Sequence, residues 1–112
     1  MSTYPNETIA VIFVNQRTGV DDAGYQTAAA AMEMLAKEQD GYCGIDSVRN
    51  EDGAGITISY WQNDAAAKAW RDNAEHAAIR EAGRNRWYAS YSLHVAEIAR
   101  SYDWPEQQAA QQ

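Results

Sequence analysis

The spacing of hydrophobic residues along this chain predicts six secondary-structure segments. Short apolar runs and two-residue alternation predict strands over residues 8–16, 42–49, 55–61 and 87–100. Apolar residues three and four positions apart predict helices over residues 23–39 and 65–82. The resulting β-α-β-β-α-β order is that of the ferredoxin-like fold, in which both helices cover one face of an antiparallel sheet. The predicted fold class is therefore α+β.

Each predicted helix carries one apolar stripe that can pack against the sheet. The first stripe comprises Tyr25, Ala28, Ala29, Met32, Leu35 and Ala36, and the second comprises Ala66, Ala67, Trp70, Ala74, Ala77 and Ala78. Asp21 and Asp22 precede the first helix and Gly41 follows it, as is typical of capping residues. Large aromatic residues are sparse in both stripes, so Trp70 is predicted to dominate the packing of the second helix.

The first and last predicted strands indicate a dimer. Residues 9–14 are all apolar, so both faces of the first strand are hydrophobic, whereas the helices cover only one face. The last strand spans about fourteen residues, or roughly 45 Å, which is more than a domain of this size needs. A homodimer with facing sheets, forming a dimeric α+β barrel, satisfies both observations. A monomer with a bent or bulged last strand is the alternative.

The composition is that of one globular domain. The chain has 112 residues, of which 46% are hydrophobic and 22% charged. We expect the domain to span residues 8–102, between a polar lead-in at 1–7 and a tail at 103–112. Trp104 in the tail is expected to dock on its own domain or on a partner subunit.

The charge balance excludes several classes of partner. With 9 basic and 16 acidic residues the net charge is -7, which disfavours nucleic acid and anionic membrane surfaces. The longest apolar run, residues 9–14, is too short to cross a bilayer. A single cysteine excludes an internal disulfide framework. The polar start of the chain has no basic leader, so a cytoplasmic location is predicted.

Several polar and aromatic residues are predicted to line a pocket between the sheet and the helices. Asn15 ends an otherwise apolar strand, where a buried amide needs a hydrogen-bond partner or a ligand. Trp70 serves either as a core anchor or as the wall of a flat ligand. His76 is a candidate proton-transfer group, with a surface histidine as the alternative.

The remaining candidates are expected to bind substrate. They are Tyr60, Trp61, Arg84, Trp87 and Tyr88. Simple alternation places Tyr88 and Tyr91 on opposite faces of the last strand, so they share one pocket only if the strand is bulged. No P-loop, dinucleotide fingerprint, metalloprotease motif or nucleophile elbow is present. We therefore expect no nucleotide, flavin or metal cofactor.

Seven short runs together resemble the antibiotic biosynthesis monooxygenase (ABM) family of dimeric α+β barrels. They lie at residues 10–13, 41–44, 56–61, 69–71, 75–76, 83–88 and 91–95, and the resemblance covers about residues 8–102. The order of a strand Trp, a helix Trp, a Glu-His pair and a Gly-Arg pair resembles in particular that of small stand-alone bacterial members. The resemblance implies the same fold and a homodimer.

The same resemblance implies two kinds of chemistry. Some family members oxidise phenols with no metal or flavin, because the deprotonated substrate itself reacts with oxygen. Others degrade haem in a pocket with an Asn, a Trp and a His. Asn15 and Trp70 match the first two positions, but the third is Arg80 here, and His76 comes one turn earlier.

The sequence therefore leads to one hypothesis with two alternatives. The hypothesis is a cofactor-independent monooxygenase that oxidises an aromatic, phenolic or quinol-like small molecule with O2. Asn15 and Trp70 would position the reactants and His76 would move a proton. The alternatives are a haem-binding or haem-degrading protein, and a non-catalytic dimeric module that binds a ligand.

Overall fold

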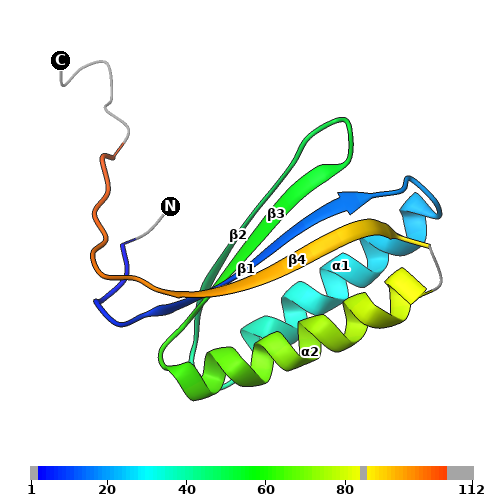
Figure 1. The fold of residues 1–112 in the computed structure, drawn as a ribbon. Helices are drawn as coiled ribbons and strands as arrows, with labels where there is room; N and C mark the ends of the chain where they lie inside the picture. Colours follow the sequence, from blue (N-terminus) through cyan, green and yellow to red (C-terminus); the bar gives the residue numbers. More distant parts are fainter. Residues whose placement is uncertain (1–2, 84–85, 106–112) are drawn as a thin grey trace, which may run out of the picture.

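The computed structural model describes residues 3–83 and 86–105 and confirms the predicted order of elements (Figure 1). The strands are β1 (Ile9–Arg17), β2 (Tyr42–Arg49), β3 (Ala54–Trp61) and β4 (Tyr88–Glu97), and the helices are α1 (Asp22–Lys37) and α2 (Asp64–Gly83). The strands form one antiparallel sheet in the order β2-β3-β1-β4. This is the ferredoxin-like arrangement that the hydrophobic spacing predicts.

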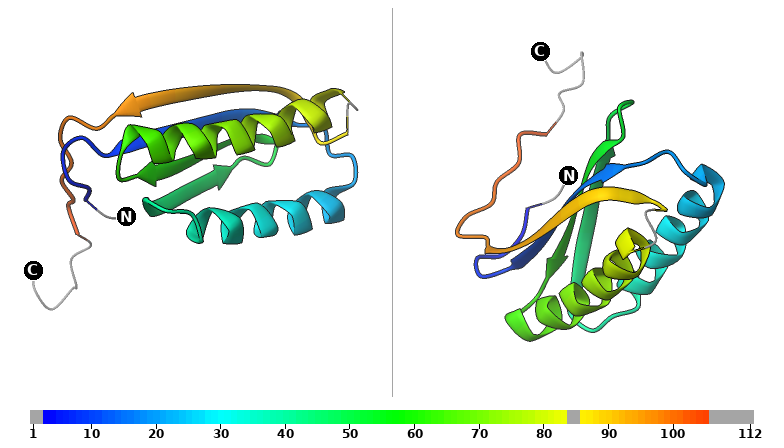
Figure 2. Two further views of the ribbon diagram at one scale, coloured as in Figure 1. Left: turned by 90° about the horizontal axis from the view of Figure 1, so that it is seen from below. Right: turned by 45° about the vertical axis from the view of Figure 1, so that its right-hand side comes forward.

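Both helices lie on one face of the sheet, but they do not pack equally closely. In Figure 2, α2 runs directly beneath β1 and β4, whereas α1 lies farther from the strands. The residues of α2 in the buried core are Ala67 and Trp70, whereas α1 contributes Ala36. The separation of α1 from the sheet leaves the space in which the candidate site lies.

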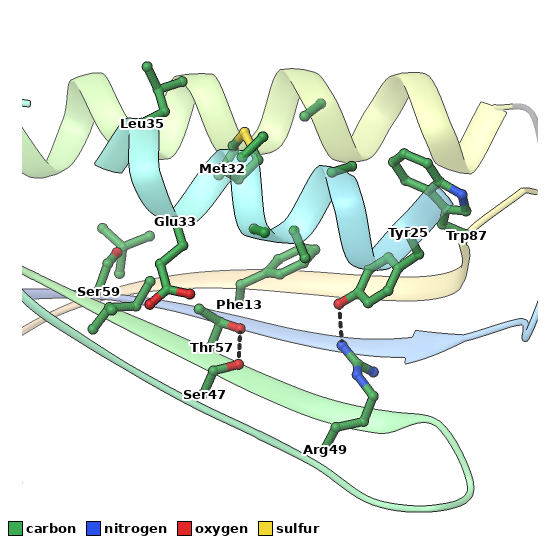
Figure 3. A pocket seen from close by; sticks show the side chains of 18 of the residues that line it. Phe13, Tyr25, Met32, Glu33, Leu35, Ser47, Arg49, Thr57, Ser59 and Trp87 are labelled. Atoms are coloured by element: carbon green, nitrogen blue, oxygen red, sulfur yellow. Dashed lines mark hydrogen bonds between the residues drawn. The ribbon is translucent and has the colours of Figure 1, made fainter. Parts of the chain in front are cut away.

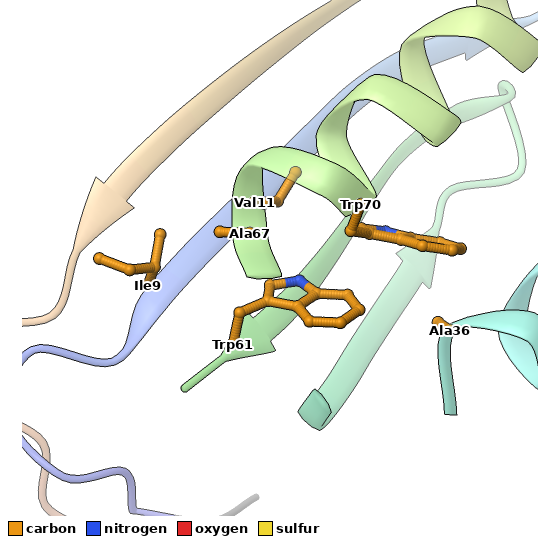
Figure 4. Packing of buried hydrophobic residues seen from close by; sticks show 6 residues of the cluster. All are labelled: Ile9, Val11, Ala36, Trp61, Ala67 and Trp70. Carbon is orange, nitrogen blue, oxygen red and sulfur yellow. The ribbon is translucent and has the colours of Figure 1, made fainter. Parts of the chain in front are cut away.

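The buried core gathers at one end of the two layers, around a pair of tryptophans (Figure 4). Trp61 at the end of β3 is fully buried, and its ring stacks on Trp70 of α2 at a centroid distance of 5.6 Å. The Nε1–H of Trp61 donates to Ser59 Oγ at 2.9 Å, so its polar atom is satisfied. Trp61 is therefore a core residue.

The last strand differs from its prediction in length and in register. It has ten residues and ends at Glu97, so it is shorter than the hydrophobic pattern predicts. Gln16 pairs with Ser90 but Arg17 pairs with Tyr88, so Ala89 is an extra residue in a β-bulge. The bulge brings Tyr88 and Tyr91 to the same face, and both rings contact Phe13. Simple alternation is therefore wrong at this end of β4.

The centre of the sheet face opposite the helices is apolar and is covered by no helix of the described chain. Ala10, Ile12 and Val14 of β1 lie beside Ile56 and Ile58 of β3 on this face, and no helix of the described chain packs on it. Tyr4 stacks on Tyr60 at a centroid distance of 4.1 Å and covers one end. The double-sided hydrophobicity of β1 therefore leaves an exposed apolar face on the single chain.

The segment after β4 leads away from the domain (Figure 1). Trp104 is 88% exposed, so it does not dock on its own domain as one of the two expectations has it. Among the helices of the described residues, none is long and apolar enough to cross a membrane.

Candidate functional site

A cavity of about 880 Å³ lies between α1, α2 and the sheet (Figure 3). Its volume is in the range of small-molecule sites. Most of the lining is apolar or aromatic, with a few polar groups. The lining residues used below are Phe13, Tyr25, Met32, Glu33, Ser47, Arg49, Thr57, Ser59, Trp70, Trp87, Tyr88 and Leu93.

The aromatic walls are held in place by contacts with one another. Phe13 projects from β1 and meets the Tyr88 ring edge-on, at 5.3 Å and an interplanar angle of 88°. Tyr25 of α1 contacts Trp87 and Tyr88, also edge-on, at 6.0 and 5.9 Å. Trp70 is fixed from behind by Trp61. Such walls suit a flat aromatic molecule, because rings pack edge-to-face or offset-stacked on one another.

Tyr25 is fixed between two arginines at the end of the cavity near the β2–β3 hairpin. The Arg49 guanidinium donates a hydrogen bond to Tyr25 Oη at 2.7 Å. The Arg17 Cζ lies 3.7 Å from the centre of the Tyr25 ring, in a cation–π contact. Arg17 is itself buried, and it donates to Asp22 Oδ1 at 2.7 Å and to the Trp87 carbonyl at 2.8 Å. The Tyr25 hydroxyl therefore accepts a hydrogen bond from Arg49 at this end of the cavity.

Tyr88 lies next to Tyr25 and is a second hydroxyl donor. Burial raises the pKa of Tyr88, and the neighbouring Tyr25 hydroxyl raises it further, whereas Arg49 and Arg17 act in the opposite direction. A tyrosine with a raised pKa stays protonated at neutral pH. Tyr88 is therefore suited to donate a hydrogen bond to a ligand oxygen.

The floor of the cavity carries hydroxyl groups, and one carboxylate faces it. Ser47 Oγ and Thr57 Oγ1 lie 2.9 Å apart on neighbouring strands. Figure 3 shows the Glu33 side chain pointing from α1 toward this pair. Lys37 Nζ lies 3.6 Å from Glu33 Oε1, one helical turn along the helix. Glu33 is the only carboxylate among the described lining residues, so it is the candidate proton acceptor of the cavity.

Asn15 is buried with its amide unpaired. The residue is 5% exposed, and neither Nδ2 nor Oδ1 has a hydrogen-bond partner. It lies on the helix-facing side of β1, paired with Gly55 and Tyr91 on the two neighbouring strands, and not on the cavity wall itself. A buried amide without partners costs about 1–3 kcal/mol. Among the described residues, Asn15 therefore carries a buried amide that costs stability.

Replacing Asn15 tests this cost directly. Asn15→Leu keeps the side-chain size and removes both unpaired atoms, so we expect the free energy of unfolding to rise by about 1 kcal/mol. Urea denaturation followed by circular dichroism measures the change. A loss of stability of similar size would contradict the assignment, because it would mean that the amide has a structural partner.

The structure brings together some of the residues predicted from sequence and separates others. Trp70, Trp87 and Tyr88 line the cavity, and Asn15 lies nearby on the same face of the sheet. Trp61 lies in the core behind Trp70. Arg84 lies outside the described residues.

Tyr60 and His76 do not face the cavity. Tyr60 is on the opposite face of the sheet, where its hydroxyl donates to Asp46 Oδ2 at 3.0 Å. Burial and this hydrogen bond raise the pKa of Tyr60 to about 12. His76 is exposed on α2 and is not a lining residue. Its predicted proton-transfer role therefore has no support from its position.

Sequence reasoning misses several polar residues of the cavity, among them Tyr25, Glu33 and Arg49. The hydrophobic pattern assigns Tyr25 to the apolar stripe of the first helix and gives no role to Glu33 or Arg49. Glu33 lies one residue after Met32 of that stripe, and Arg49 ends β2 just before the Asp-Gly turn. A charged residue at the last position of a strand beside a turn was the available signal for Arg49.

The described residues contain no group of three His, Cys, Asp or Glu side chains that could hold a metal ion. The chain has two histidines, and both lie away from the cavity. His76 is exposed on α2, and His94 is exposed on the sheet face opposite the helices. A haem in this cavity would therefore have no imidazole ligand from the described lining residues, unlike the Asn, Trp and His pocket on which the haem alternative is based.

Comparison with known proteins assigns the chain to a family. Residues 9–82 match the sequence model of the family described as "Antibiotic biosynthesis monooxygenase". The chain belongs to the antibiotic biosynthesis monooxygenase (ABM) family. It is 45% identical over 91 residues to the uncharacterized protein YqjZ of Bacillus subtilis strain 168. The matched segment covers 81% of this chain and 79% of YqjZ. The predicted resemblance to the ABM family is thereby confirmed, with the family model matching residues 9–82.

Solved structures agree with this assignment at the level of the fold. SnoaB from Streptomyces nogalater, a cofactor-independent oxygenase, superposes with a TM-score of 0.66 at 14% identity, covering 89% of this chain and 99% of SnoaB. The NE2512 protein of Nitrosomonas europaea, of unknown function, superposes with a TM-score of 0.68 at 12% identity, covering 92% of this chain and all of NE2512. Both structures therefore share the fold of this chain.

Proposed function

We propose that this ABM protein is a cofactor-independent monooxygenase that oxidises a flat phenolic or quinol-like molecule with O2. The observation that carries the proposal is the open cavity of about 880 Å³ with fixed aromatic walls. A purely structural module would fill this space with its own side chains, because protein interiors are close-packed. The fold shared with SnoaB, which is a cofactor-independent oxygenase, supports the reaction class.

The proposed reaction balances without an external reductant. In the keto tautomer of such a phenol or quinol, a CH2 group between two aromatic rings loses a proton to give a stabilised carbanion, which transfers electrons to O2. A C–O bond forms and the O–O bond then breaks. One oxygen atom ends in the new carbonyl group, and the other leaves as water with the two substrate hydrogens. The protein needs only to hold the anion, accept the proton and exclude water.

The cavity residues divide these tasks among them. Phe13, Trp70 and Trp87 form the walls against which the rings pack. Tyr88 donates a hydrogen bond to the substrate oxygen on which negative charge develops. Glu33 accepts the proton, because its carboxylate faces the cavity, whereas His76 is not a lining residue.

Oxygen consumption tests the proposal. The purified protein is supplied with a panel of anthrones, phenols and quinols, and turnover above the uncatalysed rate is the expected result. Glu33→Gln is expected to lower kcat about 100-fold, as loss of a general base does, while Glu38→Gln, at the end of α1, leaves it unchanged. Equal rates for Glu33→Gln and the unsubstituted protein would remove Glu33 from the mechanism.

The proposal also includes a homodimer formed through the open sheet face. Ala10, Ile12 and Val14 there lie beside two isoleucines of β3, and a second copy would bury them. Trp104 on its extended segment is free to reach such a partner. An exposed apolar surface of this kind marks an interface.

A further inference from the structure

We infer that Arg49 binds an anionic substituent of the substrate, so that the cavity selects aromatic carboxylates over their neutral counterparts. This inference rests on the proposed function, because it assumes that the molecule in the cavity is a substrate. The binding itself can be measured without turnover.

Arg49 is at the mouth of the cavity and is exposed on one side. It lies at the end of β2, where Nη1 donates to the Gly53 carbonyl at 2.6 Å and Nη2 donates to Tyr25 Oη at 2.7 Å. These two bonds fix the guanidinium across the hairpin end of the cavity (Figure 3). A fixed guanidinium with further N–H groups is suited to a planar carboxylate.

The positive charge of Arg49 is not balanced by the described chain. Arg17 is neutralised by Asp22, whereas Arg49 forms no ion pair with any described carboxylate. Asp52 is nearby in the turn, but its Oδ1 accepts from the Ala54 N–H at 2.9 Å. Of the two charged lining residues, Glu33 already has Lys37 as its partner. An unpaired cation at the mouth of an apolar cavity attracts an anion in a protein of charge -7.

The sheet beneath Arg49 is shaped to receive the guanidinium. Arg49, Gly55 and Asn15 are directly opposite one another on β2, β3 and β1. A Cβ atom at Gly55 would lie 2.6 Å from Arg49 Cζ, so the glycine leaves the space that the guanidinium occupies. The glycine in the middle of the row therefore lets the guanidinium lie close to the sheet at the edge of the cavity.

The test compares two probes of nearly equal shape, anthracene-2-carboxylate and anthracene-2-carboxamide. Binding is followed by quenching of tryptophan fluorescence at neutral pH. We expect the unsubstituted protein to bind the carboxylate at least 10-fold more tightly, with a preference that falls as salt is added. Arg49→Gln should weaken carboxylate binding about 10- to 100-fold and leave carboxamide binding intact.

Two further variants separate charge from structure. Gly55→Ala keeps the arginine but displaces its guanidinium, and is expected to abolish the preference in the same way. Arg71→Gln removes an arginine that pairs with Asp72 on α2 outside the cavity, and should change neither affinity. A preference that survives in Arg49→Gln would overturn the inference. So would loss of both probes in Arg49→Gln and Gly55→Ala, or failure of both to bind the unsubstituted protein.

Failure of the anion site and failure of the oxygenase activity give different results. A carboxylate preference without oxygen consumption would reject the oxygenase activity and retain the anion site. Oxygen consumption with equal binding of the two probes would retain the activity and reject the anion site.

Discussion

Trp61→Ala is expected to lower the free energy of unfolding by about 3–5 kcal/mol, the typical cost of deleting a buried aromatic side chain. Trp61 is fully buried and stacks on Trp70, and Tyr42 meets its ring edge-on at 5.8 Å. Its removal leaves a cavity beneath α2 and leaves Ser59 Oγ without its donor. Urea denaturation followed by far-UV circular dichroism, at one protein concentration, measures the change.

Trp104→Ala is the matched control for this substitution. Trp104 is 88% exposed, so the same truncation should change stability by less than about 0.5 kcal/mol. A cost below about 1.5 kcal/mol for Trp61→Ala would show that the core does not depend on the tryptophan pair. A large cost for Trp104→Ala would show instead that the tail residue is buried in the assembled protein.

Ile12→Asp is expected to convert a homodimer to a monomer. Ile12 is at the middle of β1 on the open face, paired with Ile58 and His94 on the neighbouring strands. In a single chain the carboxylate would stay partly hydrated, but between two facing sheets it would be buried without a partner, which costs several kcal/mol. Light scattering should give a mass of about twice 12.5 kDa for the unsubstituted protein and 12.5 kDa for Ile12→Asp.

A charge elsewhere should not have this effect. Val20 is 51% exposed in the turn before α1, so Val20→Asp should leave the mass unchanged. A monomeric unsubstituted protein, or a dimeric Ile12→Asp variant, would reject the open face as the interface. Because β4 has only ten residues, its length does not require a partner subunit. The dimer is therefore predicted mainly from the exposed apolar face.

Local patterns were enough to predict the fold. The helical stripes and strand runs specify six elements, and β2 begins and ends where its apolar pattern does. The Asp-Gly turn and the capping residues also predict where the chain reverses. The error in β4 has a physical cause, since a β-bulge inserts one residue and inverts the alternation on one side of it. The residue types at positions 88–91 do not predict the extra residue of this bulge.

The candidate site was harder to predict, because its residues come from all six elements. Trp70 and Asn15 stand out in sequence as a large aromatic on a stripe and an amide on an apolar strand. Tyr60 and His76 stand out equally, but the sheet face and the helix face that they occupy depend on tertiary packing. Arg49 gains its importance from Tyr25 and Gly55, which are 24 and 6 positions away, so only the assembled sheet reveals it.

The separation of α1 from the sheet makes stability depend on whether the cavity is occupied. A molecule that fills the space between the layers binds the folded chain and not the unfolded one, so mass action must raise the melting temperature. At a concentration of one hundred times Kd, the gain is about 2.7 kcal/mol. Because α1 packs incompletely on the sheet, compounds that bind the cavity can be identified by the increase in Tm that they cause. This measurement requires no knowledge of the reaction.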